Sequence, residues 1–240
     1  MNALEVHGVG FAYGARQALC ELEFATAVGR FTALLGPNGA GKSTLIALLT
    51  RLYDLRQGDI RVLGHSLARE PRQALARLGV VFQQSTLDLD LTVEQNLRYH
   101  AALHGLSRRT AAQRIDRELA RQDLGERRHA RVRELNGGHR RRVEIARALL
   151  HDPALLLLDE ASTGLDPASR AALGQHVRAL TDEGMSVLWT THLLDEIRPT
   201  DEVLVLDRGR LVAQGSAARL SGESSLSDAF TRLTRPETVA

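Results

Sequence analysis

A glycine-rich segment at residues 36–44 constrains the fold more than any other part of the chain. It follows an apolar run at residues 31–35, which predicts a buried strand, and it precedes an apolar run at residues 45–49, which predicts the start of a helix. A strand, a loop with the spacing Gly-x4-Gly-Lys-Ser and a helix, in this order, are the context that identifies a P-loop. The loop consists of Gly36, Pro37, Asn38, Gly39, Ala40, Gly41, Lys42, Ser43 and Thr44.

The chemistry of this loop is the binding of phosphate groups. Glycines let the backbone turn sharply and direct its N–H groups inward, and the amino terminus of the following helix adds the positive end of its dipole. Lys42 supplies a point charge for the β- and γ-phosphates, and the Ser43 hydroxyl is placed to ligate Mg²⁺. Lys42 is the only lysine in the sequence, so a compact ammonium stands at this one position while arginine serves elsewhere. The sequence therefore predicts binding of a nucleoside triphosphate.

Composition narrows the remaining classes of protein. A length of 240 residues suits one large domain or two small ones. The single cysteine, Cys20, excludes a disulfide framework and a cysteine metal cluster. A formal charge of +2 favours no particular partner, although a pI near 9.1 leaves nucleic acid open. No signal peptide is visible, and the apolar stretch at residues 154–158 is too short to span a bilayer, so we expect a cytoplasmic protein.

Apolar runs and turn residues predict alternating strands and helices. Strands are expected at residues 4–11, 20–27, 31–35, 58–62, 78–82, 154–158, 186–190, 202–206 and 210–214. Helices are expected at residues 45–53, from 71, between 139 and 153, at 167–183 and at 226–233. Residues 92–122 have a helical pattern with no strand, which indicates an all-helical insertion. The alternation implies an α/β fold with a largely parallel sheet.

A second signal for phosphate chemistry follows a run of four leucines. Asp159 and Glu160 come directly after this predicted strand. A carboxylate at the carboxyl end of a buried strand can reach Mg²⁺ beside the P-loop, and the adjacent glutamate can orient or deprotonate a water molecule. Together with the P-loop, the pair predicts hydrolysis of the bound nucleotide.

These motifs and four others make the chain resemble the nucleotide-binding subunit of ABC transporters over nearly its full length. Residues 36–44 match the family's P-loop and residues 155–159 its Walker B strand. Further matches are the signature Leu-Asn-Gly-Gly-His at 135–139, the Q-loop glutamine Gln83, the D-loop at 164–166 with Asp166, the switch histidine His192 and the adenine-stacking aromatic residue Tyr13. Motifs in the correct order and spacing are far more specific than any one of them.

The resemblance implies a composite active site. Two subunits would enclose two ATP molecules, with the P-loop of one subunit facing the signature of the other. Glu160 would be the general base, and His192 would contact the γ-phosphate. Gln83 would contact Mg²⁺ and the attacking water and link the site to an integral membrane permease. Residues expected at the nucleotide also include Asn136, Gly137, Gly138 and His139, and those expected at Mg²⁺ are Ser43, Gln83 and Asp159.

The resemblance also implies a domain plan. We expect one ABC ATPase domain over residues 1–240: a P-loop NTPase core with a mainly parallel sheet, an N-terminal antiparallel β portion and an inserted α-helical subdomain. The core lobe is expected at residues 1–83 and 150–222, the helical subdomain at 84–149 and a short tail at 223–240.

Three positions depart from the family's pattern. Asn136 stands where serine is usual, His139 where glutamine is usual, and Ala-Ser at 161–162 where Pro-Thr is usual. An asparagine amide can donate to a phosphate as a serine hydroxyl does, but it is longer and planar. His139 can make the site sensitive to pH near neutrality. The glycines at 137–138 still offer backbone N–H groups at a helix start.

An arginine-rich segment at residues 127–142 has two interpretations. It can bind nucleic acid, or it can be a solvated helix face with pairs such as Arg140–Glu144. No aromatic residues for base stacking interleave with the arginines, which favours the second interpretation.

Three functions remain open after this comparison of motifs. The signature and the helix after it are similar to ABC-2 exporters, and its Asn and His variant is similar to ATPases associated with quinone-dependent alcohol oxidation. A soluble ABC ATPase that acts on DNA or ribosomes is the alternative, although the chain lacks the coiled-coil insertions, zinc modules or second cassette of such proteins. A third possibility is a nucleotide-binding partner that barely hydrolyses.

Overall fold

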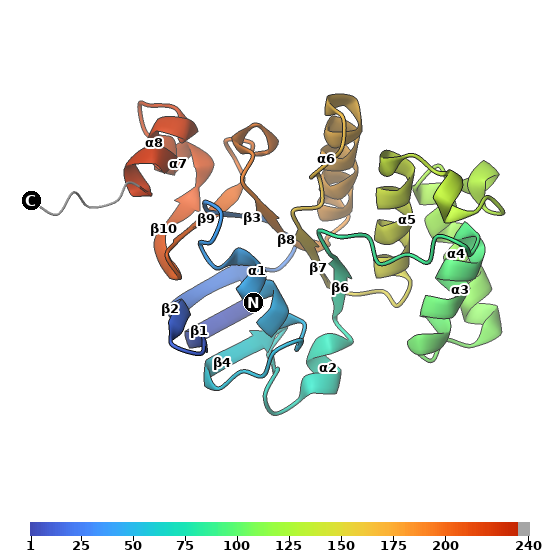
Figure 1. Ribbon diagram of the computed structural model, residues 1–240, viewed down its shortest axis with the longest axis horizontal. Coiled ribbons are helices and arrows are strands. Elements are labelled where there is room, and N and C mark those ends of the chain that lie inside the picture. Colours follow the sequence, from blue (N-terminus) through green and yellow to red (C-terminus); the bar gives the residue numbers. More distant parts are fainter. Residues whose placement is uncertain (235–240) are drawn as a thin grey trace, which may run out of the picture.

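A mainly parallel, six-stranded sheet lies at the centre of the computed structural model, which describes residues 1–234. The strands are β1 Asn2–Tyr13, β2 Arg16–Ala27, β3 Phe31–Leu35, β4 Gln57–Val62, β5 His65–Ser66, β6 Leu78–Val81, β7 Leu155–Asp159, β8 Ser186–Thr191, β9 Glu202–Asp207 and β10 Arg210–Ser216. The central order is β10-β9-β3-β8-β7-β6, in which only β10 runs antiparallel to its neighbour. A second, antiparallel sheet has the order β2-β1-β4-β5 (Figure 1).

The helices cover the central sheet and form a lobe beside it. They are α1 Lys42–Leu49, α2 Pro71–Leu75, α3 Val93–Leu103, α4 Arg108–Arg121, α5 Gly137–Leu149, α6 Pro167–Asp182, α7 Ala217–Ser221 and α8 Leu226–Leu233. Figure 1 shows α3, α4 and α5 together on the right, while α7 and α8 lie at the opposite side. The α/β fold with an antiparallel portion and an inserted helical part is therefore as predicted.

Three apolar clusters explain this layering. In the first, α1 packs between the antiparallel sheet and one face of the central sheet. In the second, α6, α7 and one side of α5 cover the other face. In the third, α3, α4 and the other side of α5 pack on one another. Because α5 contributes to the second and third clusters, it joins the helical lobe to the sheet.

The central strands are buried on both faces, as is usual for parallel strands. Every residue of β3 and β7 is buried. Successive side chains of β3 alternate between clusters, since Leu34 belongs to the first cluster and Leu35 to the second. The carboxyl ends of the parallel strands meet at one edge of the sheet, which is where ligands bind in such folds.

The predicted helical segment and the predicted P-loop helix compare differently with the structure. The helical pattern at residues 92–122 forms two helices, α3 and α4; between them Gly105 adopts a left-handed conformation with φ 70°, and Ser107 caps α4. The P-loop helix ends at Leu49, earlier than expected, and Arg51 leaves the helical region with φ 55°. The short elements β5 and α7 were not predicted from the sequence. Residues 235–240 of the expected tail lie outside the described residues.

Arginines of the segment at residues 127–142 make contacts within the protein. The expected pair Arg140–Glu144 is wrong: Glu144 pairs with Arg141 at 2.6 Å, and Arg140 donates to the carbonyl oxygens of Val132 and Arg133. The reason is burial, because Arg141 and Glu144 both lie on the covered side of α5, where a charge needs a partner.

Within residues 1–234, no helix is long and apolar enough to cross a membrane.

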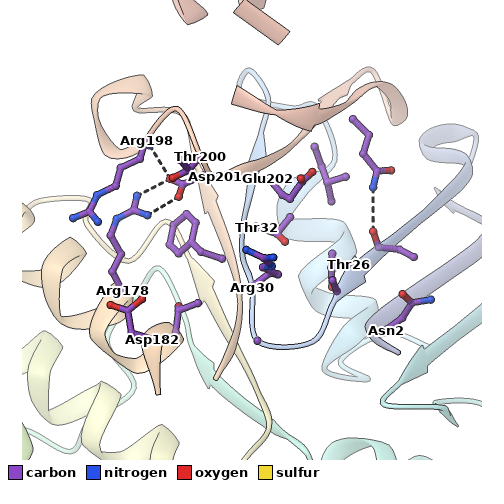
Figure 2. A pocket seen from close by; sticks show the side chains of 17 residues that line it. Asn2, Thr26, Arg30, Thr32, Arg178, Asp182, Arg198, Thr200, Asp201 and Glu202 are labelled. Carbon is purple, nitrogen blue, oxygen red and sulfur yellow. Dashed lines mark hydrogen bonds and ion pairs between the residues drawn. The ribbon is translucent and has the colours of Figure 1, made fainter. Parts of the chain in front are cut away.

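A buried ion pair stabilises the edge of the sheet opposite to the carboxyl strand ends. Here a cavity of about 550 Å³ opens at the start of β3 and β9 (Figure 2). Arg178 of α6 donates to both carboxylate oxygens of Asp201 at 2.7 Å, and its guanidinium lies 4.3 Å from the centre of the Phe31 ring. The Arg198 N–H also donates to Asp201. These contacts tie α6 to the turn before β9, so the polar lining of this cavity has a structural explanation.

We expect Asp201→Asn to lower the free energy of unfolding by about 2–3 kcal/mol, because hydrogen bonds between charged groups are lost while the shape is kept. Urea denaturation measures this difference. Glu202→Gln, at the exposed neighbouring position, is the matched control and should change stability little. Equal stability of both variants and the wild type would show that the buried pair contributes nothing net.

Candidate active site

A cavity of about 710 Å³ lies at the carboxyl edge of the central sheet. It is lined by Tyr13, Arg16, Gln17, Ala18, Asn38, Gly39, Gly41, Lys42, Ser43, Thr44, Gln83, Glu160, Thr163, His192 and Arg208. Four parallel strands deliver the predicted residues: β3 leads into the P-loop, β6 towards Gln83, β7 to Glu160 and β8 to His192. The structure thus brings together residues that are far apart in sequence. The volume of the cavity is in the range of small-molecule sites.

The amino terminus of α1 is open to a phosphate. Among the described helices of eight or more residues, α1 is the one without a side chain that caps its first N–H groups; α3, α4, α5, α6 and α8 all have one. Its N-cap residue, Gly41, has φ 110°, and a side chain there would meet Leu19 and the Ala18 carbonyl. Uncapped N–H groups and the helix dipole form an anion site.

Lys42 is held inside this loop. Its side chain is 4% exposed, and Nζ donates to the carbonyl oxygens of Gly36 at 2.7 Å and Pro37 at 3.3 Å. Gly36 and Pro37 therefore form the back of the loop and do not line the cavity, and the same is true of the buried Ala40. The ammonium is already fixed where a β- or γ-phosphate would meet the uncapped helix end.

Two carboxylates follow one another at the end of β7. Burial raises the pKa of the Asp159 carboxyl, which accepts a hydrogen bond from the Thr190 hydroxyl at 2.7 Å. Glu160 has φ 45°, a left-handed conformation that costs about 1–3 kcal/mol in a non-glycine residue. Its N–H donates to the Thr190 carbonyl and hydroxyl oxygens at 3.1 and 2.9 Å. Thr190 of β8 thereby turns the Glu160 side chain into the cavity.

Three side chains of the cavity contact the Glu160 carboxylate. Lys42 Nζ lies 3.5 Å from one oxygen and His192 Nδ1 lies 3.6 Å from the same oxygen. The Gln83 amide donates to the other oxygen at 3.1 Å. Three predicted groups thus converge on the predicted base, and a water molecule placed there would contact it.

Sequence reasoning missed the residue that holds the Q-loop. Arg141 of α5 donates to the carbonyl oxygens of Phe82 at 2.7 Å and Gln83 at 3.1 Å, and it pairs with the buried Glu144. A guanidinium with several buried acceptors holds this backbone rigidly. The cavity residues Arg16, Gln17, Ala18, Thr163 and Arg208 were also not predicted. Arg208 lies in the turn between β9 and β10, and no sequence motif indicated that it would line the cavity.

The signature residues lie outside the cavity of their own chain. Asn136 is the N-cap residue of α5, and its Oδ1 accepts a hydrogen bond from the His139 N–H at 2.8 Å. Within residues 1–234 its amide nitrogen makes no hydrogen bond, so one asparagine can cap its helix and still offer a donor outwards. A side chain at Gly138 would meet Ser169 at the start of α6, whereas one at Gly137 would find only Leu165 at 3.5 Å.

The remaining predicted residues are Tyr13, Asp166 and His139. Tyr13 is 46% exposed at the cavity and its hydroxyl lies 3.3 Å from the Thr44 hydroxyl. Asp166 is the N-cap residue of α6 and, like the signature, does not line the cavity; hydrogen bonds from Ser169 lower the pKa of Asp166. Burial, Arg142 and Arg127 lower the pKa of His139. The lowered pKa favours the neutral form of His139 and shifts the expected pH sensitivity towards more acidic pH.

Comparison with known proteins now decides the family. A family model described as "ABC transporter" matches residues 19–163, more than half of the chain. The chain belongs to the ABC transporter family. As a member of it, this ABC ATPase binds ATP and hydrolyses it to power transport.

Individual relatives agree with this assignment. The chain is 40% identical over 224 residues to the daunorubicin resistance ATP-binding protein DrrA3 of Streptomyces coeruleorubidus, covering 93% of this chain and 71% of that protein. It is 39% identical over 214 residues to the Nod factor export ATP-binding protein I of Rhizobium johnstonii, covering 89% and 69%. The solved structure of an ATP-binding subunit of an ABC transporter is similar with a TM-score of 0.85 and 29% identity, covering 97% of this chain and 100% of that one. The resemblance seen in the motifs is confirmed.

Proposed function

We propose that this ABC ATPase works as a dimer of two copies, each completing the other's active site, and drives a separate ABC-2 type permease as an exporter. Relatives named for drug resistance and Nod factor export support export. On this proposal the protein lies at the inner face of the cell membrane through the permease. The chain is one domain with core residues 1–83 and 150–222, helical residues 84–149 and a tail from 223.

The main support for the proposed dimer is the position of Asn136. Asn136 is exposed and lies outside the cavity that contains Lys42 and Glu160, although α5 begins there with glycine N–H groups suited to an anion. A second copy would bring these groups to the nucleotide. If so, the rate of hydrolysis per chain rises with protein concentration, which a phosphate-release assay over a dilution series tests.

The geometry around Glu160 supports the catalytic roles that we propose. A water molecule beside this carboxylate attacks the γ-phosphorus, the bond to the β–γ bridging oxygen breaks, and Glu160 accepts the proton of the water. His192 donates to the γ-phosphate, and Gln83 positions the water. Lys42 leaves Glu160 and pairs with the phosphates, because these carry the larger charge. ADP and phosphate are the products.

The proposed metal is Mg²⁺, and the residues present fit it. Asp159, the Ser43 hydroxyl and the Gln83 side-chain oxygen are hard oxygen donors, which Mg²⁺ prefers. Because burial already raises the pKa of Asp159, a cation beside it would compensate a poorly solvated charge. When bound, Mg²⁺ would neutralise the negative charge that develops on the phosphates.

We expect Asn136→Asp to reduce hydrolysis at least about tenfold at a fixed protein concentration, because like charges facing each other across an interface cost several kcal/mol. An aspartate is as good an N-cap as asparagine, so helix α5 and the single chain should stay intact. ATP affinity at low protein concentration should also stay the same. Hydrolysis and nucleotide binding, measured on the same samples, separate assembly from folding.

Asn136→Ser is the matched control. It restores a hydroxyl that can cap the helix and donate to phosphate, and it should hydrolyse ATP at least as fast as the wild type. If Asn136→Asp keeps the normal rate and the normal concentration dependence, then the segment is only a structural cap and the composite site is not formed here.

A further inference from the structure

Three histidines meet in the helical lobe, away from the active-site cavity. His100 lies in the last turn of α3, His104 is the residue that ends α3, and His151 lies in the turn between α5 and β7. One potential ligand nitrogen from each lies within 4.8 Å of the other two. The ring centres of His104 and His151 are 3.9 Å apart, and those of His100 and His104 are 4.6 Å apart. None of the three lines the nucleotide cavity.

The hydrogen bonds of His151 orient it as a ligand. Its Nε2 lies 2.8 Å from the carbonyl oxygen of Leu78, so this nitrogen carries the proton and donates. The other nitrogen, Nδ1, then has a free lone pair; it is buried and has no hydrogen-bond partner among the described residues. Metal-binding histidines usually donate their second ring N–H to a backbone carbonyl or carboxylate in this way. The hydrogen bond to the backbone of β6 thus leaves His151 with a buried, unsatisfied acceptor.

Burial of the rings favours the protonation state that binds a metal. Burial lowers the pKa of His100 to about 3 and that of His151 to about 4, and it also lowers the pKa of the more exposed His104. These shifts favour the uncharged imidazole, which is the ligating form.

The charges around the cluster select the class of ion. Arg147 faces His100, and its guanidinium donates to the Thr86 carbonyl at 2.9 Å. Arg114 faces His151 but pairs with Asp152 at 2.6 Å. Since no carboxylate belongs to the cluster itself and cationic groups stand nearby, a hard cation that needs oxygen ligands is disfavoured. Nitrogen ligands suit zinc and similar transition-metal ions.

We propose that His100, His104 and His151 bind one divalent transition-metal ion of the zinc class, with water as the fourth ligand. Zinc bonds of about 2.0–2.1 Å in tetrahedral geometry bring ligand nitrogens to about 3.4 Å from one another. The rings of His104 and His151 are stacked with an interplanar angle of 10°, so their in-plane lone pairs do not meet at one point in this arrangement. Binding therefore requires the His104 ring to rotate out of the stack, which its exposed position at the end of α3 allows. The bound ion joins α3 to the turn that leads into β7.

To test this proposal, Zn²⁺ is titrated into the full chain without a histidine tag and without nucleotide, and the heat of binding is measured. The zinc content of the protein is then measured after gel filtration. We expect one tight zinc ion per chain in the wild type. His104→Gln should bind it at least about tenfold more weakly, as loss of a direct ligand costs no less than loss of an outer-shell partner. His7→Gln removes a partly exposed imidazole in β1 and is the matched control, which should bind like the wild type.

Cobalt absorption and thermal melting test the same site independently of the zinc titration. Cobalt(II) in place of zinc should give the intense visible absorption of a tetrahedral site in the wild type and in His7→Gln, and not in His104→Gln. Zinc should also raise the melting temperature only where the site is intact, because a ligand that binds the folded state stabilises it. Absence of tight zinc binding in the wild type, or equal binding in His104→Gln, would overturn the proposal and leave a stack of neutral rings.

Discussion

Lys42→Ala is expected to lower the affinity for ATP by about 10²-fold or more, because charge-assisted hydrogen bonds contribute roughly 1.5–3 kcal/mol each. The ammonium is buried within the P-loop, where the carbonyl groups of Gly36 and Pro37 orient it at the uncapped end of α1. Isothermal titration of the nucleotide-free variant with ATP and Mg²⁺ measures the loss.

The control for this prediction is Arg51→Ala, which removes a cation just beyond the other end of α1. Arg51 is directed to the Leu67 carbonyl and Asp54 and should not affect ATP affinity. Circular dichroism must show that both variants are folded, because Lys42 also ties the loop together. Affinity of Lys42→Ala within twofold of the wild type would contradict the assignment of Lys42 to the phosphates.

The P-loop and the cavity residues at the strand ends were predictable because their signals are local. Residues 36–44 contain the whole motif, and each of Gln83, Asp159 and His192 follows an apolar run short enough to be recognised as a strand. Once the strands are parallel, their carboxyl ends must meet at one edge, so the gathering of these residues follows from topology.

What the sequence could not predict depends on long-range contacts. Arg141 was one of many arginines, and only the packing of α5 shows that it holds the Q-loop backbone. The left-handed conformation of Glu160 requires Thr190 from the neighbouring strand. The sequence predicted helical stretches on both sides of the break between α3 and α4 but not its position, because an isolated glycine such as Gly105 is compatible with a continuous helix. The roles of the signature residues stay predictions, because they need a second copy.

Glu160→Gln is expected to slow hydrolysis by about 10²–10⁴-fold, the range that a positioned general base contributes. The amide keeps the volume of the carboxylate but cannot accept a proton from water. Affinity for ATP should stay within a few fold of the wild type or rise, because the mutation removes a negative charge 3.5 Å from Lys42 that competes with the phosphates. Phosphate release and nucleotide titration measure the two quantities separately.

The same substitution should also make the proposed dimer visible. If hydrolysis is what separates the two copies, a variant that binds ATP and cannot cleave it accumulates as a dimer, and gel filtration with and without ATP and Mg²⁺ detects this shift. Glu126→Gln, at an exposed position outside the cavity, is the matched control and should hydrolyse ATP normally and stay in the wild-type equilibrium. Turnover of Glu160→Gln near the wild-type rate would exclude Glu160 as the base. Arrested turnover without an ATP-dependent dimer would keep Glu160 in its role and remove the support for association driven by ATP.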